Sequence, residues 1–201
     1  MQVFLETERL TLRQFTEDDA DNLVELDGDP DVMRYLSGGP ATPREEIEND
    51  ILPHFLNYYT RFEAFGFWAA IEKSSGDFLG WFHFRPQEGR EENGVELGYR
   101  LRKSAWGKGY ATEGSLALID LGFRELGVER VYAGTYEENI GSRRVMEKSG
   151  LKFVRSYRFT TEDLQAMGID PDTFPADEFP GEEVEYALIR EDWERRRASE
   201  A

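Results

Sequence analysis

The clearest pattern of apolar and polar positions in the chain runs through residues 94–101. There Val95, Leu97, Tyr99 and Leu101 alternate with glutamate, glycine and arginine. A period of two is typical of a strand with one buried face. We therefore predict a strand over these residues.

The period changes a few residues later. Leu116, Ile119, Phe123 and Leu126 recur every three or four positions, and Gly127 follows them. This spacing predicts a helix with one apolar face, and the glycine predicts a left-handed residue just after the helix ends.

Alternation and turn residues predict further strands. Residues 67–71 and 78–84 flank the polar turn at 74–77 and form a predicted hairpin. A second polar turn, at 88–93, leads from this hairpin to the strand at 94–101. Residues 130–136 alternate again and predict one more strand.

Capping residues predict where helices begin. Thr16 and Thr42 each precede residues typical of a first helical turn, and Pro43 is expected at the first helical position. A short helix is predicted from Asn139 to Gly150. The segment 166–183 is acidic and contains three prolines, so we predict a long loop there and not a linker to another domain.

The turn between the strand at 94–101 and the helix after it reads Trp106-Gly107-Lys108-Gly109-Tyr110-Ala111-Thr112-Glu113. A glycine turn that enters a helix points unpaired N–H groups outward at the positive end of the helix dipole, which attracts an anion such as a pyrophosphate. A Walker loop is excluded because glycine, and not Ser or Thr, follows the lysine. A dinucleotide fingerprint has weak support, because a threonine stands where a third glycine is needed. A tightly packed helix entry without any ligand stays open.

A second cluster of residues narrows the choice. Asn139, Ser142, Val145, Glu147, Lys148, Gly150 and Leu151 keep the spacing Asn-x-x-Ser-x-x-Val-x-Glu-Lys-x-Gly-Leu, and residues 5–13 read Leu-Glu-Thr-Glu-Arg-Leu-Thr-Leu-Arg, with a Tyr-Leu pair at 35–36. Together with the Gly-Lys-Gly turn, these segments resemble the GNAT superfamily of acyl-CoA-dependent N-acyltransferases, and within it the RimJ/RimL-like branch. The resemblance covers residues 5–157, and residues 184–193 resemble the closing strand.

This resemblance implies a fold and a function. The fold is α/β, a single GNAT-like domain over residues 1–201 with a mixed, largely antiparallel central sheet flanked by helices. The function is transfer of an acetyl group from acetyl-CoA directly to a primary amine. The residues implied to bind the cofactor are Leu101, Arg102, Trp106, Gly107, Lys108, Gly109, Tyr110, Ala111, Thr112, Asn139 and Arg143. Backbone N–H groups from Tyr99 to Leu101 are implied to hold the acyl carbonyl and the pantetheine arm at a strand bulge.

The resemblance also implies two catalytic residues. Glu96 occupies the position of an acidic general base that acts directly or through water. Many members carry a tyrosine that protonates the leaving thiolate, but Met146 stands at that position here, so Ser142 is suggested as the acid instead. A solvated, structural role for Glu96 stays open, as does a purely capping role for Asn139.

Composition limits the class of protein. A chain of 201 residues with 39% hydrophobic content suits one domain. It has no apolar run long enough to span a bilayer and no signal-like start, so a cytoplasmic protein without a membrane partner is expected. The lack of cysteine excludes disulfides, thiolate metal sites and a cysteinyl acyl-enzyme, and no metal-ligand spacing is present.

Histidine and aromatic residues supply no catalytic motif. His54 and His83 lie in no recognisable pattern, and His83, which alternates with phenylalanines in a strand, is interpreted as structural. The aromatic residues between 58 and 81 are interpreted as core, with a wall of an acceptor pocket as the alternative.

The net charge of −17 is unevenly distributed. Residues 17–31 and 162–185 hold two acidic blocks that contain no Lys or Arg. The proposed cofactor segments instead hold a basic set, namely Arg100, Arg102, Lys103, Lys108, Arg143, Arg144 and Lys148. A local basic site in an acidic protein fits an anionic cofactor such as coenzyme A, whereas a pI near 4.6 argues against nucleic acid.

The acceptor is left open between a protein N-terminus and a small-molecule amine such as a polyamine or an aminoglycoside. The acidic blocks have two interpretations, a cleft that attracts a cationic amine or solvated surface. A non-catalytic or weakly catalytic acyl-CoA-binding module is the alternative to an enzyme, and succinyl-CoA or another acyl-CoA is the alternative donor. A homodimer stays open.

Overall fold

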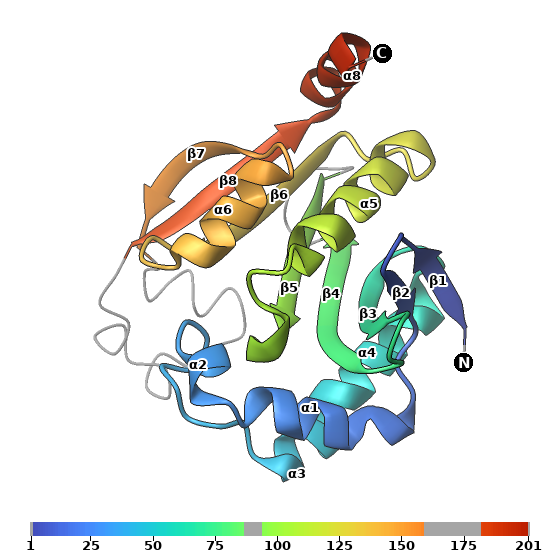
Figure 1. The fold of residues 1–201 in the computed structure, drawn as a ribbon, viewed down its shortest axis with the longest axis vertical. Coiled ribbons are helices and arrows are strands. Elements are labelled where there is room, and N and C mark those ends of the chain that lie inside the picture. The colour runs from blue at the N-terminus through green and yellow to red at the C-terminus, as the bar shows by residue number, and fades with distance from the viewer. Residues whose placement is uncertain (1, 87–93, 159–181, 201) are drawn as a thin grey trace.

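The computed structural model describes residues 2–86, 94–158 and 182–200. Within them, one sheet has the strand order β1-β2-β3-β4-β5-β6-β8-β7 (Figure 1). The strands are β1 Val3–Glu6, β2 Leu10–Arg13, β3 Gly66–Glu72, β4 Phe78–Pro86, β5 Gly94–Leu101, β6 Arg130–Tyr136, β7 Lys152–Tyr157 and β8 Glu183–Ile189. Neighbouring strands are antiparallel except for β5 and β6, which are parallel. The predicted mixed, largely antiparallel sheet is confirmed.

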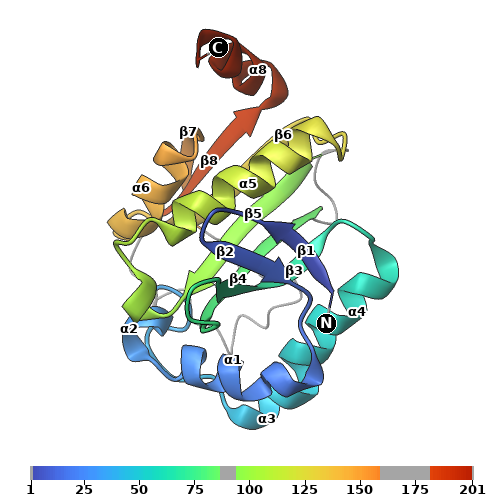
Figure 2. The same ribbon diagram turned by 45° about the vertical axis from the view of Figure 1, so that its right-hand side comes forward.

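Helices cover both faces of this sheet (Figures 1 and 2). The α-helices are α1 Ala20–Asp27, α2 Pro30–Met33, α3 Arg44–Glu46, α4 Leu52–Arg61, α5 Tyr110–Arg124, α6 Ile140–Lys148 and α8 Arg190–Glu200. Residues 17–19 and 103–105 form 3₁₀ turns, and residues 47–51 form a π-helical segment between α3 and α4. One core lies under α5 and α6, and a second core lies under α1 and α4.

The contact of α5 with the sheet depends on two glycines. A Cβ atom at Gly114 would lie 2.4 Å from Cζ of Phe82, and one at Gly122 would lie 2.6 Å from Cζ of Phe84. Both phenylalanines are fully buried on β4. The helix therefore packs on the rings of β4 more closely than any larger residue at these positions would permit.

The same glycines explain one wrong prediction. Leu116 was expected on the buried face of the helix, yet it is 38% exposed, and Leu118 is buried instead. Ile119 and Phe123 are buried as predicted. A pattern of apolar side chains does not identify glycine as a contact residue, so the predicted face included Leu116 and missed the side of the helix that carries Gly114 and Gly122.

The predicted hairpin at residues 67–84, the strands at 94–101 and 130–136 and the helix after Asn139 are all confirmed. The closing strand is shorter than the resemblance suggested, because it ends at Ile189 and the charged residues after it begin α8. Pro43 caps α3 from outside and is not its first residue. The predicted turn at 88–93 and most of the predicted loop at 166–183 lie outside the described residues, although Glu183 opens β8. No described helix is long and apolar enough to cross a membrane.

The glycine contact of α5 predicts an unusual effect of a Gly→Ala change in a helix. Gly114→Ala should lower the free energy of unfolding by about 1–2 kcal/mol, because overpacking against Phe82 outweighs the gain in helix propensity of about 1 kcal/mol. Thermal unfolding measures this. The matched control is Gly141→Ala in α6, where a Cβ would lie 3.6 Å from its nearest neighbour and only the propensity gain is expected. Equal shifts in the two variants would contradict the packing argument.

Candidate active site

The sheet opens between its two parallel strands. β5 pairs with β6 only through Gly94, Val95 and Glu96, whereas it pairs with β4 from Val95 to Leu101. β6 in turn pairs with β8 along its whole length. Beyond Glu96, the edge of β5 that faces β6 has no strand partner in the described structure. Its backbone N–H and C=O groups are therefore available to a ligand.

The glycine turn lies at the open end of this split. Gly107 and Gly109 adopt φ values of 71° and 87°, in the left-handed region that favours glycine, and Gly109 is the N-cap of α5. A Cβ at Gly107 would meet nothing within 4 Å. The first N–H groups of α5 have no partner inside the helix, so the turn presents open space next to donors at the positive end of a helix dipole. The strand, the glycine turn and the helix lie in the predicted order, and binding of an anion at this turn stays a prediction.

Residues near the N-terminus brace this turn. The backbone N–H and Nε of Arg9 donate to the Glu113 carboxylate at 2.8 and 2.6 Å, and the hydroxyl of Thr7 donates to it at 2.6 Å. Arg9 also donates to the carbonyl of Lys108 at 2.9 Å, and its guanidinium lies 4.5 Å from the centre of the Tyr110 ring. Burial alone would raise the pKa of Glu113, but these hydrogen bonds lower it below its ordinary value. The brace fixes the glycine turn and the first turn of α5 to the connection between β1 and β2.

Most of the loop side chains assigned to the cofactor are engaged by the protein itself. Trp106 folds back and donates from its indole to the carbonyl of Leu101 at 2.8 Å. Tyr110 is buried, and its hydroxyl donates to Glu72. Arg102 donates to Glu25 at 2.7 Å. The loop therefore offers a ligand chiefly its backbone and Lys108, which forms no ion pair within the described residues.

The early acidic block supplies the counter-ions for the basic segment that follows β5. Arg100 pairs with the buried Asp27 at 2.5 Å, and Lys103 pairs with Asp31 at 2.5 Å. Arg102 and Glu25 form a third pair across the same gap. Neither interpretation of this block, as an amine-attracting cleft or as free solvated surface, anticipated these pairs. The part of the basic set next to α1 and α2 is neutralised within the fold.

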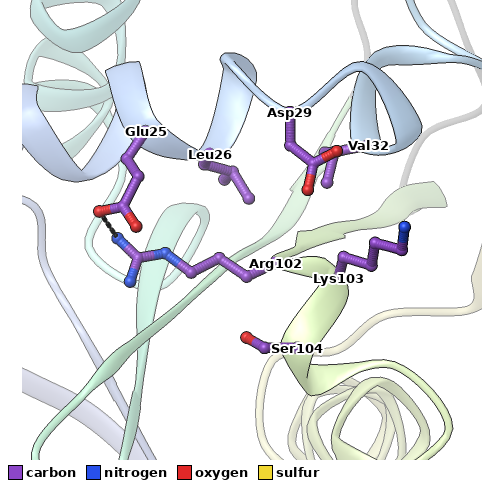
Figure 3. Close-up of a pocket in the computed structure, with 7 residues that line it drawn as sticks. All are labelled: Glu25, Leu26, Asp29, Val32, Arg102, Lys103 and Ser104. Atoms are coloured by element: carbon purple, nitrogen blue, oxygen red, sulfur yellow. Dashed lines mark hydrogen bonds and ion pairs between the residues drawn. The ribbon is translucent and has the colours of Figure 1, made fainter.

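A small pocket lies between these ion pairs. It encloses about 170 Å³, which is less than the ~300–1,000 Å³ of typical ligand pockets. Its lining comes from α1, α2 and the start of the turn, and consists of Glu25, Leu26, Asp29, Val32, Arg102, Lys103 and Ser104. Figure 3 shows the Arg102 side chain pointing across the pocket to Glu25. The pocket lies between the turn and helices α1 and α2, and it is too small to hold a coenzyme.

Glu96 lies where the split begins, on the sheet face that carries the second core. It stands opposite Arg85 in the β4–β5 register and accepts a hydrogen bond from it at 2.9 Å. His83 Nε2 lies 3.6 Å from the same carboxylate, and the His83 ring lies against Gly98. Burial lowers the pKa of His83 to about 4, an effect that Glu96 opposes and that Arg85 and Arg100 reinforce. The imidazole is therefore uncharged at neutral pH.

The other side of the split is formed by the start of α6. Asn139 caps the helix by accepting from the Ser142 N–H at 3.1 Å, and its amide donates to Thr135 at 3.1 Å. The hydroxyl of Tyr99 on β5 lies 3.0 Å from that of Ser142, so a hydrogen bond links the two sides of the split. Met146 is 2% exposed and belongs to the core.

Arg143, which was assigned to the cofactor, donates to the Tyr186 hydroxyl at 3.1 Å and to the carbonyl of Glu137 at 3.0 Å. Tyr186 lies on β8, so these bonds fasten α6 to the neighbouring strand. The prediction of a bulge near Tyr99 to Leu101 is wrong. β5 pairs with β4 in unbroken register, and the irregular position belongs to β4, where it pairs with β3 near Gly80.

Glu183 is a further acidic residue near this region that the motifs did not single out. It opens β8 opposite Tyr136, four residues along β6 from the Tyr132 that pairs with Glu96. Burial raises the pKa of Glu183 to about 7. Glu183 lies at the end of β6 that is remote from the β5–β6 pairing, whereas Glu96 is itself one of the residues that pair β5 with β6.

Comparison with known proteins identifies the family. The model of the acetyltransferase (GNAT) domain matches residues 9–152. The chain belongs to the GNAT acetyltransferase family. It is 31% identical to "FsC-acetyl coenzyme A-N(2)-transacetylase" of Aspergillus fumigatus, over 95% of this chain and 78% of that protein. The enzyme predicted from the sequence is confirmed as an acetyltransferase, and GNAT acetyltransferases use acetyl-CoA.

Solved structures support the same family. A GNAT acetyltransferase from Bacillus anthracis superposes with a TM-score of 0.71 at 25% identity, over 95% of this chain and 99% of that one. RimL, a ribosomal L7/L12 alpha-N-protein acetyltransferase solved in complex with coenzyme A, shares the fold with a TM-score of 0.71 at 17% identity, over 94% of this chain and 98% of that one. Acetyl-CoA also fits what this GNAT chain presents, an unpaired strand edge that leads to an open glycine turn.

The open space at Gly107 predicts that an alanine there weakens acetyl-CoA binding but destabilises the fold no more than an alanine at a comparable glycine turn. Gly107→Ala should weaken acetyl-CoA binding at least about tenfold. The added methyl group would project into the space proposed for the ligand, and alanine disfavours the left-handed backbone conformation that the turn needs at this position. Titration calorimetry measures the affinity. Gly76→Ala is the matched control, since Gly76 has φ 79° and equally free surroundings in the β3–β4 turn. Both variants should lose similar stability, and equal affinity in the two would contradict the assignment.

The brace predicts a pH-dependent contribution to stability. Glu113→Gln should lower the free energy of unfolding by about 1–2 kcal/mol at pH 7, because it removes a charge-assisted hydrogen-bond network. The folded-state pKa of Glu113 lies below its ordinary value of 4.5. The difference from the parent protein should therefore stay constant down to about pH 5 and disappear only as the pH falls through the lowered pKa. Urea unfolding at several pH values measures this, and a difference that shrinks between pH 7 and 6 would contradict it.

Proposed function

We propose that this acetyltransferase transfers the acetyl group of acetyl-CoA directly to a primary amine, with both substrates bound at the split between β5 and β6. The observation that carries the proposal is the position of Glu96. It is the last residue of β5 paired with β6, so it stands where the free strand edge begins. A carboxylate at that point can accept a proton from an amine that reaches the edge.

The cofactor is assigned to the strand edge and the turn. The backbone of β5 after Glu96 would hold the pantetheine arm, and the backbone from Gly107 to Thr112 would hold the pyrophosphate. The Leu101 carbonyl accepts from the Trp106 indole, and the Arg102 N–H and carbonyl are bonded to Leu79 and Ala105, so these two residues would border the arm and not bind it through those groups. Lys108 is the cation of the turn, and Asn139 and Arg143 form the far wall at α6. Bound acetyl-CoA supplies an activated thioester. Because Arg102, Trp106 and Tyr110 have partners within the protein, their side chains shape the turn instead of supplying charge to the ligand.

Direct transfer requires three balanced events. The amine nitrogen forms a bond to the acetyl carbon, the carbon–sulfur bond breaks, and the ammonium proton passes to Glu96 directly or through water. Backbone N–H groups on the free edge of β5 stabilise the oxyanion that forms between these events. His83, held uncharged by its buried position, adds no competing positive charge beside the base.

The departing thiolate requires a proton, and Met146 cannot supply one. Ser142 and Tyr99 are hydroxyls joined to each other at the split, which supports Ser142 as the acid, with Tyr99 as its partner. Burial raises the pKa of Tyr99, so its hydroxyl stays protonated. Tyr99 was named in the sequence only for its backbone, since a strand pattern does not show which helix its side chain will meet.

The acceptor class follows from the relatives as a proposal. The name of the Aspergillus fumigatus protein specifies transfer to an N(2) nitrogen, and that of RimL specifies a protein alpha-N group. A primary amine is common to the predicted acceptors, a protein N-terminus or a small molecule such as a polyamine or an aminoglycoside. Action in the cytoplasm and a homodimer stay predictions from the sequence.

Release of coenzyme A thiol tests this function. The protein is incubated with acetyl-CoA and a panel of peptides, amino acids, polyamines and aminoglycosides, and the thiol is followed with a chromogenic reagent. Glu96→Gln should lower kcat by about 10²- to 10⁴-fold with little change in acetyl-CoA affinity, because it removes a general base but not the cradle. Glu129→Gln, at an exposed ion pair with Arg190, is the matched control.

The alternatives give different results in the same assay. Saturable acetyl-CoA binding without thiol release from any amine would favour a binding module. Release that is faster with succinyl-CoA would change the donor and keep the mechanism. An unchanged kcat in Glu96→Gln would remove Glu96 from the role of base.

A further inference from the structure

Arg85 is the cation nearest to the proposed base. It extends from β4 beside Glu96, and its guanidinium lies over the Phe67 ring at 5.5 Å. Its hydrogen bond to Glu96 comes from Nη2, and its Nε is buried without a partner. A guanidinium carries five N–H donors, so most of those on Arg85 are unused within the described residues. The side chain is 24% exposed, which leaves the guanidinium within reach of a ligand.

Two histidines lie close enough to Arg85 for its charge to help lower their pKa values. Burial lowers the pKa of His54, and Arg85 and Arg61 lower it further. Burial also lowers the pKa of His83, Glu96 opposes this effect, and Arg85 and Arg100 add to it. Both imidazoles are thus uncharged at neutral pH, and their lowered pKa values reflect nearby arginines as well as burial. Arg100 is already paired with Asp27, so among the described residues the cation directly beside Glu96 is Arg85.

The reaction itself changes the charge balance at Arg85. When Glu96 takes the proton of the amine, it becomes neutral and no longer compensates the guanidinium beside it. A half-buried cation without a counter-ion is unfavourable. An acid group on the acceptor would replace the lost charge, and the fork of the guanidinium suits a carboxylate.

We propose that Arg85 determines acceptor specificity and that the acceptor is an amine with a carboxylate a few atoms from the nitrogen, as in an amino acid. The nitrogen would lie at Glu96 and the carboxylate at Arg85, two groups that are 2.9 Å apart. This separation favours a short spacing between the amine and the acid group of the acceptor. Polyamines carry no acid group and would not meet this requirement. The proposal rests on the proposed function, and the acid group itself forms and breaks no covalent bond.

Matched acceptors separate recognition of the acid group from any effect on Glu96. Thiol release is measured with glycine, alanine, leucine and glutamine and with the carboxamide of each, and kcat/KM is expressed per unprotonated amine. The parent enzyme should prefer the carboxylates. Arg85→Gln should lower kcat/KM by about 10- to 100-fold for carboxylates and by less than about threefold for carboxamides.

Two further variants complete the comparison. Arg85→Lys keeps the charge but not the fork, so it should recover part of the preference. Arg44→Gln removes an exposed arginine of α3 that pairs with Asp21 and Glu48, and it should leave both acceptor classes unchanged. Thermal unfolding of each variant verifies that it is folded.

The outcomes distinguish failure of this inference from failure of the proposed acetyltransferase function on which it rests. Equal losses on carboxylates and carboxamides in Arg85→Gln would show that Arg85 acts only through Glu96 and would overturn the inference. Faster reaction of the parent enzyme with carboxamides or polyamines would overturn it as well, while leaving the acetyltransferase intact. No thiol release with any amine would refute the proposed function and this inference together.

Discussion

The active-site region depends on one constraint, the short pairing between the two parallel strands. β5 and β6 share three residue pairs, yet β5 pairs with β4 from Val95 to Leu101 and β6 pairs with β8 along its whole length. Each half of the sheet therefore follows its own partner, and the twist of the two halves carries them apart beyond Glu96. The free strand edge, the place of the glycine turn and the facing position of α6 all follow from this divergence. A fully paired sheet would satisfy the same backbone groups internally and leave no route for a cofactor.

Charge in this protein is used locally. The sequence shows an acidic segment and a basic segment far apart in the chain, and the fold places them together as ion pairs across the gap between α1, α2 and the end of β5. A net charge of −17 therefore says little about the potential at the site. Around Glu96 the charges are also paired, because Arg85 lies against Glu96 and Arg100, on the same sheet face, lies against Asp27. Total charge describes solubility here, and individual pairs describe the chemistry.

Periodicity and turn chemistry predicted much of the fold. The strand at 94–101 has the predicted bounds, and the glycine turn and the helix after it lie in the predicted order, because alternation and left-handed glycines are local properties. The predictions that failed concern contacts between residues far apart in the chain. Gly114 and Gly122 form the contact face of α5 because phenylalanines of β4 lie against them, and no pattern within the helix records that. The same holds for the site, where Glu96 could be named from a motif but Arg85 and Tyr99 became visible only when strand register and helix position were known.

The brace on the glycine turn has a consequence for how the chain folds. Arg9 and its partner Glu113 are 104 positions apart, so the contact joins the beginning of the chain to its middle. During synthesis Arg9 emerges 104 residues before Glu113 and cannot form this contact until Glu113 has followed. The loop closed by this contact is long, and its entropic cost is met only when α5 has formed and docked on the sheet. The glycine turn can therefore become rigid only after α5 has docked on the central strands.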